Sequence, residues 1–81
     1  MAMKYIVIKT HLGKVPVMFS GILSHDDVAR ALSKPMKITS AGFVNIIDGY
    51  VSAYGKSYSL GIKSDPLDSA LIEKHLYNSE Y

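Results

Sequence analysis

The sequence predicts an α+β fold in which two helices pack on one face of a mainly antiparallel sheet of about five strands. The expected order of elements is β-β-α-β-β-β-α. A β-branched run over residues 4–10 and an Asp-Gly turn at 48–49 between two alternating segments predict strands. Helix-start signals at Ser24 and Asp65 predict the helices.

Length and composition limit the class of protein. The chain has 81 residues, so we expect residues 1–81 to form a single domain. It contains no cysteine, which excludes disulfides and thiolate metal sites and favours a reducing cytoplasm. No apolar run approaches the roughly 20 residues that a membrane-spanning helix needs, and the first residues lack a signal-peptide pattern. We therefore expect neither a membrane partner nor export.

The first three elements follow from local patterns. Residues 4–10 are apolar at both parities, which predicts a central strand buried on both faces. Residues 15–19 form the second strand, and Pro16 places it at a sheet edge because proline has no N–H to donate. Ser24 then caps a helix expected over residues 25–33, with two aspartates in its first turn.

The hairpin at the Asp-Gly turn has a defined register. Extended structure resumes at residues 36–39, and Gly42 predicts a bulge or a close approach of another backbone. A type I′ turn at 48–49 requires positive φ at both central residues, which Asp-Gly supports. Ile47 then pairs with Tyr50, and the pairing continues back to Phe43 with Tyr54. Because strand side chains alternate, the predicted core face holds Val44, Ile46, Val51 and Ala53.

The last two elements follow from a glycine and a proline. Gly55 predicts a second tight turn that pairs Ala53 with Tyr58, so that Tyr58, Leu60 and Ile62 join the core face. Asp65 caps the final helix, with Pro66 at its first position and Asp68 at its third, and we expect the helix to end near Tyr77. On a helical wheel Leu67, Leu71, Ile72, His75 and Leu76 lie on one side.

Motifs for chemistry are weak. The three histidines have no ligand-type partner three or four residues away, so we expect no metal and no cofactor. His25 precedes two aspartates, but acidic residues in a first helical turn are explained by the helix dipole. Lys56, Ser57 and Ser59 resemble a Ser/Lys nucleophile, yet they fall on a predicted turn of a chain too small for a deep cleft. The sequence therefore predicts no catalytic residue and no enzyme.

The outer face of the hairpin is the predicted binding surface. Tyrosine offers a large contact area together with a hydroxyl and is enriched at protein interfaces. An alternative stays open, in which the same residues only stabilise the sheet through cross-strand aromatic pairs. The predicted partner-binding residues are Phe43, Asn45, Ile47, Tyr50, Ser52, Tyr54, Ser57 and Ser59.

Charge bears on the kind of partner. Nine Lys and Arg side chains against seven Asp and Glu give a net charge of +2, and the basic residues are scattered. We expect a protein partner and a homodimer, with nucleic acid as the alternative because exposed tyrosines stack on bases. A basic rim of Lys37 and Lys56 around Tyr50 and Tyr54 would favour nucleic acid. A small hydrolase is a third reading.

Four segments resemble a family of small, uncharacterised bacteriophage and prophage proteins. They are residues 4–9, 40–43 (Ser-Ala-Gly-Phe), 54–61 (Tyr-Gly-Lys-Ser-Tyr-Ser-Leu-Gly) and 63–68 (Lys-Ser-Asp-Pro-Leu-Asp). The resemblance covers most of the chain and carries no motif of known chemistry. It implies an accessory protein in the host cytoplasm that binds a host or phage protein stoichiometrically, for example as an anti-defence or anti-CRISPR inhibitor.

Overall fold

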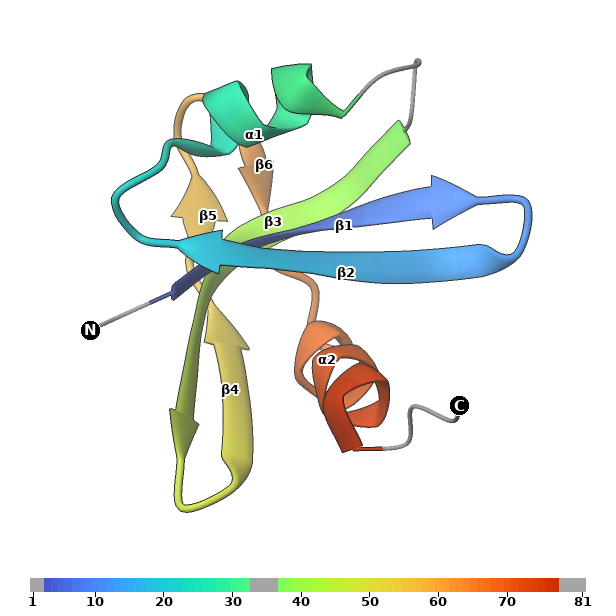
Figure 1. Ribbon diagram of the computed structural model, residues 1–81, viewed down its shortest axis with the longest axis vertical. Helices are drawn as coiled ribbons and strands as arrows, with labels where there is room; N and C mark the ends of the chain where they lie inside the picture. The colour runs from blue at the N-terminus through green and yellow to red at the C-terminus, as the bar shows by residue number, and fades with distance from the viewer. Residues whose placement is uncertain (1–2, 33–36, 78–81) are drawn as a thin grey trace.

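The computed structural model describes residues 3–32 and 37–77 and confirms the α+β class (Figure 1). The main sheet is antiparallel, with four strands in the order β2-β1-β3-β4, and a second sheet pairs β5 with β6. The strands are β1 (Met3–Thr10), β2 (Gly13–Ser20), β3 (Lys37–Ile47), β4 (Tyr50–Tyr54), β5 (Lys56–Ser57) and β6 (Ile62–Lys63). The helices are α1 (His25–Ala31) and α2 (Asp68–Tyr77).

Strand β1 is the centre of the fold, as predicted. It lies between β2 and β3, and the four residues from Tyr5 to Ile8 are all buried. Strand β2 is an edge, with Pro16 opposite Val7 of β1. The apolar residues at both parities of β1 therefore supply both faces of the sheet with core side chains.

The two helices cover opposite faces of the sheet, so the prediction that they share one face is wrong (Figure 1). Tyr5 and Val7 pack in one cluster with Ile72 of α2. Ile6 and Ile8 pack in the other cluster, which includes Val28 of α1. Successive strand side chains point to opposite faces, and a sheet whose central strand is apolar on both sides needs cover on both.

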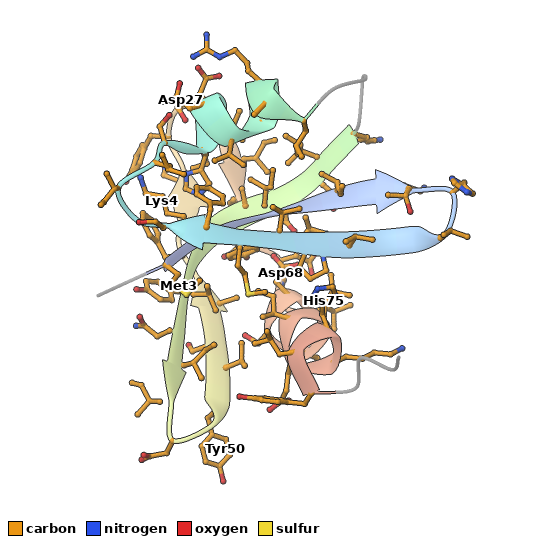
Figure 2. All side chains as sticks on the ribbon, in the orientation of Figure 1. Met3, Lys4, Asp27, Tyr50, Asp68 and His75 are labelled. Atoms are coloured by element: carbon orange, nitrogen blue, oxygen red, sulfur yellow. The ribbon has the colours of Figure 1, made fainter. Side chains whose placement is uncertain are left out.

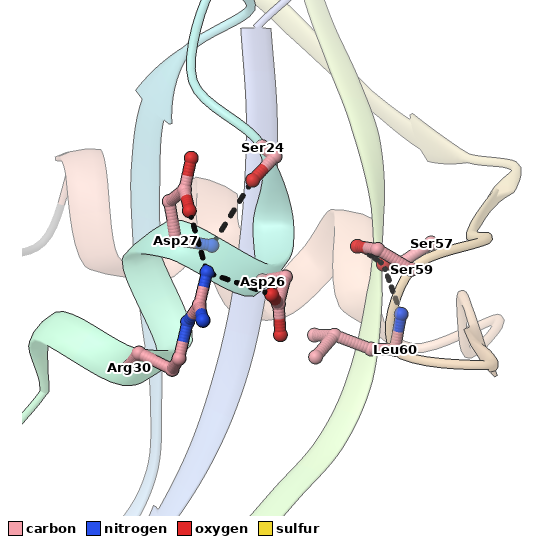
Figure 3. Close-up of polar contacts among 7 residues, drawn as sticks. All are labelled: Ser24, Asp26, Asp27, Arg30, Ser57, Ser59 and Leu60. Atoms are coloured by element: carbon pink, nitrogen blue, oxygen red, sulfur yellow. Dashed lines mark hydrogen bonds and ion pairs between the residues drawn. The ribbon is translucent and has the colours of Figure 1, made fainter.

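Helix α1 begins with the predicted cap. Ser24 Oγ accepts a hydrogen bond from the backbone N–H of Asp27 at 3.0 Å (Figure 3). The hydrogen bond with Ser24 and then the Arg30 guanidinium hold the pKa of the Asp27 carboxyl below its usual range. The helix ends at Ala31, with Leu32 as its C-cap. The predicted end at residue 33 and the predicted strand start at residue 36 lie outside the described residues.

The β3–β4 hairpin has the predicted register. Ile47 pairs with Tyr50 and Phe43 with Tyr54, and the turn has φ of +52° at Asp48 and +83° at Gly49. Further back on β3, a Cβ on Gly42 would clash with the carbonyl oxygen of Tyr54, which confirms the predicted close approach.

The predicted irregularity of β3 also exists. Val7 pairs with Ser40 while Ile8 pairs with Ile38, so Thr39 is the extra residue of a bulge. Ile38 and Ala41, three residues apart, consequently face the same cluster. The bulge lies three residues before Gly42 and changes which parity of β3 faces α1.

The strand predicted to follow Gly55 does not extend the main sheet. Ser69 Oγ of α2 accepts a hydrogen bond from the backbone N–H of Ala53 at 2.9 Å. A fifth strand beside β4 would need this N–H as a donor. Residues 56–57 instead pair with residues 62–63 in the second sheet, which gives the order β-β-α-β-β-β-β-α. Leu60 and Ile62 do join a core, on the side of α1, whereas Tyr58 is 82% exposed.

Helix α2 has a reciprocal cap. Asp65 Oδ1 accepts from Leu67 N at 2.8 Å, and Asp68 Oδ2 accepts from Asp65 N at 2.9 Å. The helix is assigned from Asp68 and ends at Tyr77 as predicted. Its buried apolar side is narrower than the wheel suggests, because Ile72 is buried while Leu67 and His75 are exposed.

Candidate interaction surface

The hairpin presents one uncovered face, which we call the hairpin face and define as Asn45, Ile47, Tyr50 and Ser52. Helix α2 packs on the opposite side of the hairpin, against Val51 and Ala53. At the tip, Ile47 is 66% exposed and Tyr50 is 77% exposed. Figure 2 shows Tyr50 projecting from the tip away from the body of the protein.

On the side of the hairpin that faces α2, side chains are less buried toward the tip. Ile46, predicted as core, is 42% exposed. Tyr77 of α2 does reach this end, where its hydroxyl donates to the carbonyl oxygen of Gly49 at 3.2 Å. The tip is therefore anchored by a hydrogen bond and only partly packed.

Phe43 and Tyr54 contact each other across β3 and β4 and so contribute to the stability of the hairpin. Their rings stack with centroids 5.9 Å apart and planes inclined by 29°. Asn45 Nδ2 also donates to the Tyr54 hydroxyl at 3.3 Å. This part of the predicted surface matches the alternative reading, in which cross-strand pairs hold the sheet together.

His25 is a core residue that the sequence reading placed only at a helix start. Its side chain is 4% exposed, and Nε2 donates to the carbonyl oxygen of Gly42 at 2.8 Å. Its ring meets Phe19 and Phe43 edge-on, with centroids 5.4 and 5.9 Å away. The spacing of His25 to Val28 and Leu32 on one helical side is the signal that predicts this inward position.

Asp68 is a buried acidic residue whose carboxylate accepts hydrogen bonds from two side-chain hydroxyls. Tyr5 Oη donates to its Oδ2 at 2.5 Å, and Ser40 Oγ donates to its Oδ1 at 3.0 Å. Burial first, and then the hydrogen bond and charge of Asp68, raise the pKa of the Tyr5 hydroxyl. The cluster is closed off: Tyr5, Ser40 and Asp68 are at most 4% exposed.

The serines after Gly55 belong to a turn. Ser57 is 1% exposed, and its Oγ accepts from Leu60 N at 3.1 Å and lies 3.4 Å from Ser59 Oγ (Figure 3). Ser57 is therefore not on the exposed face where the sequence placed it, while Ser59 is exposed. Lys56 Nζ lies 4.6 Å from the centroid of the Tyr58 ring, so it faces an aromatic ring and does not pair with Ser57.

Three adjoining hollows surround Lys56 and Tyr58, and we call them together the lysine–tyrosine hollow. Their volumes are about 460, 390 and 230 Å³. Sequence reasoning missed this site because it placed Tyr58 in the core. The side chains that define it are Lys4, Phe43, Tyr54, Lys56, Tyr58 and Lys63.

The basic rim around Tyr54 differs in composition from the expected one. Lys56 lies beside Tyr54, but Lys37 pairs with Lys9 at the opposite end of β3. Lys4 and Lys63 take the place that the prediction gave to Lys37. The aromatic and basic side chains thus meet at Tyr54 and Tyr58, and the hairpin tip at Tyr50 is a separate end of the surface.

A comparison of the chain with protein-family models, with curated proteins and with solved structures finds no match in any of the three. Within residues 3–32 and 37–77, no helix is long and apolar enough to cross a membrane. In the same ranges, no three His, Asp or Glu side chains gather into a group that could hold a metal ion. The hairpin face and the lysine–tyrosine hollow are two candidate binding surfaces.

Proposed function

We propose that this protein is a small non-enzymatic binding module that attaches to a protein partner through the hairpin face. The observation that carries the proposal is the pair Ile47 and Tyr50. They are directly paired across the turn, and both are largely exposed. Large apolar and aromatic side chains that share one exposed patch are typical of protein interfaces.

The hairpin is held in shape before any partner binds. The backbone of Gly49 is tied to α2 through the Tyr77 hydroxyl, and α2 packs on the side of the hairpin opposite the binding face. Association costs less when the contacting side chains stand on a preformed support, because fewer torsions are ordered on binding. This rigidity supports recognition by side chains.

The edge of β4 is a weaker candidate for the contact. A partner strand that paired with β4 would need its free backbone groups, but the N–H of Ala53 is already bonded to Ser69 Oγ. The contact through side chains of Ile47 and Tyr50 needs no such displacement. The proposed partner therefore lies on the face of the hairpin and not on its edge.

The resemblance to small bacteriophage and prophage proteins supports a biological setting for this module. In that setting the partner is a host or phage protein in the host cytoplasm, and binding is stoichiometric, as in an anti-defence or anti-CRISPR inhibitor. No residue role is taken from the resemblance.

The test is affinity capture of the partner from host lysate, followed by calorimetric titration of the purified pair. Tyr50→Ala should weaken binding by roughly 30-fold, because truncating an aromatic hot spot commonly removes about 2 kcal/mol. Leu12→Ala is the matched control, since Leu12 is 86% exposed at the turn between β1 and β2. Equal affinities for Tyr50→Ala and wild type, with an unchanged fold, would place the interface elsewhere.

A further inference from the structure

The lysine–tyrosine hollow combines exposed aromatic rings with ammonium groups. Tyr58 is 82% exposed on the turn between β5 and β6, and Lys56 Nζ stands 4.6 Å from its ring centroid. Across the hollow of about 460 Å³, the stacked rings of Phe43 and Tyr54 form a second aromatic wall. The Lys56 ammonium lies over the Tyr58 ring, and the rest of this exposed ring is available to a planar ligand.

The charges in the hollow have one sign. Lys4, Lys56 and Lys63 line it, and among its described lining residues none is acidic. The whole chain carries seven acidic against nine basic side chains, so this local balance departs from the average. A concave surface lined by one sign of charge raises the local concentration of oppositely charged ligands.

A second observation points to an anionic ligand. Lys56 and Lys63 are direct cross-strand partners in the two-residue ladder of β5 and β6. Like charges directly opposite each other destabilise a strand pair, and this ladder is too short to offset the repulsion by itself. An anion between the two ammonium groups would relieve it.

The kind of anion follows from the side chains. A lysine ammonium binds phosphate or carboxylate as a point charge, so the aromatic rings beside the lysines decide which anionic ligand fits. Arg30 is bound to Asp26 and Asp27 on α1, at 3.0 and 2.9 Å (Figure 3). It is not among the residues that line the hollow. Aromatic platforms combined with lysines are typical of sites for single strands, where unpaired bases can stack.

We propose that the lysine–tyrosine hollow binds single-stranded nucleic acid, with a base stacked on Tyr58 and phosphates held by Lys56 and Lys63. This function goes beyond protein binding and uses a surface other than Ile47 and Tyr50. The volumes of about 390 and 460 Å³ are of the size that small-ligand sites have.

The test is fluorescence anisotropy with a labelled oligothymidine of about 12 nucleotides at low salt, a length within the usual site sizes. Tyr58→Ala should weaken binding about fivefold or more, and Tyr58→Phe should retain it because the ring face is kept. Lys56→Ala and Lys63→Ala should each reduce the slope of log K against log salt by about 0.7.

Two matched controls separate this site from general attraction. Tyr50→Ala removes an equally exposed tyrosine at the hairpin tip, and Lys14→Ala removes an exposed lysine on β2. Both variants should bind the oligothymidine as the wild type does. Circular dichroism of each variant verifies that the fold is retained.

Several results would overturn the proposal. One is the absence of binding at low salt, and another is equal binding by Tyr58→Ala and the wild type. Competition experiments could give two further contradicting results. If inorganic polyphosphate displaced the oligothymidine at equal affinity, the hollow would be an anion site without base recognition. A tyrosine-containing poly-glutamate peptide that binds more tightly, with the same lysine dependence, would make the hollow a protein-binding site.

Discussion

At the scale of single residues, Asp68 connects more of the chain than any other polar side chain described above. Its carboxylate accepts hydrogen bonds from the Tyr5 hydroxyl of β1, the Ser40 hydroxyl of β3 and the backbone N–H of Asp65. A buried charge is costly unless it is hydrogen-bonded, and here both oxygens have donors. Asp68 thereby fixes the start of α2 against two strands of the main sheet.

Because the Tyr5 hydroxyl is buried and bonded to Asp68, the free energy of unfolding should depend on pH in the alkaline range. The folded state raises the pKa of the Tyr5 hydroxyl, so it retains a proton that the unfolded chain loses above about pH 10. The contribution is complete below that pH and is lost as the pH rises further. We expect urea unfolding to show a fall in stability above about pH 10 that is smaller in Tyr5→Phe.

At neutral pH, Tyr5→Phe should be less stable than the wild type by about 1–3 kcal/mol, because Asp68 loses a donor. Tyr50→Phe, at an exposed position, serves as the control and should follow the wild type throughout. Parallel loss of stability by the wild type and Tyr5→Phe above pH 10 would show that Tyr5 does not carry the effect.

At the scale of elements, the β3–β4 hairpin depends on its two turn residues. Gly49 has φ of +83°, and a Cβ added there would meet no atom within 4 Å. The cost of a larger residue therefore comes from backbone conformation and not from a clash. Gly49→Val should lower the free energy of unfolding by about 1 kcal/mol or more in urea titrations, since a β-branched residue avoids positive φ.

Asp48 offers the corresponding control for that experiment. Its φ is +52°, and asparagine tolerates this region as well as aspartate does. Asp48→Asn should therefore unfold at nearly the wild-type urea concentration. If Gly49→Val did so too, the turn would not require a residue that tolerates positive φ.

At the scale of the whole molecule, the accessible surface is large for the mass of the chain. The accessible surface is 5567 Å². A compact monomer of 8.9 kDa has about 4,800 Å². Large apolar side chains at separate places, including Leu12, Ile22 and Ile47, remain in contact with solvent. An excess of exposed apolar surface in a small protein without disulfides favours self-association.

Because of these exposed apolar side chains, we predict that the protein forms a homodimer. Light scattering at high micromolar concentration measures the molecular mass and checks this. Ile22→Lys and Ile47→Lys, tested separately, locate the contact, because a charge in a desolvated symmetric interface appears twice and disrupts it. A wild-type protein that scatters as a monomer at that concentration would contradict the prediction.

The sequence by itself determined the features that depend on neighbours along the chain. The Asp48-Gly49 turn, the pairing from Ile47 with Tyr50 to Phe43 with Tyr54, and the cap at Ser24 follow from φ preferences and short-range hydrogen bonds. The central burial of β1 follows from its apolar residues at both parities. Ile47 and Tyr50 were predictable as an exposed pair for the same reason, since alternation assigns them to the outer face.

Only the tertiary structure decided which helix or strand packs against each face and edge of the main sheet. Alternation shows that a strand has two apolar faces, but it does not say which helix covers each of them. The chain after Gly55 does not extend the main sheet, and the outward N–H of Ala53 on β4 is bonded to Ser69 Oγ of α2, a residue distant in sequence. Strand β5 pairs with β6 in the second sheet, where Ser57 is buried and Tyr58 is exposed between lysines.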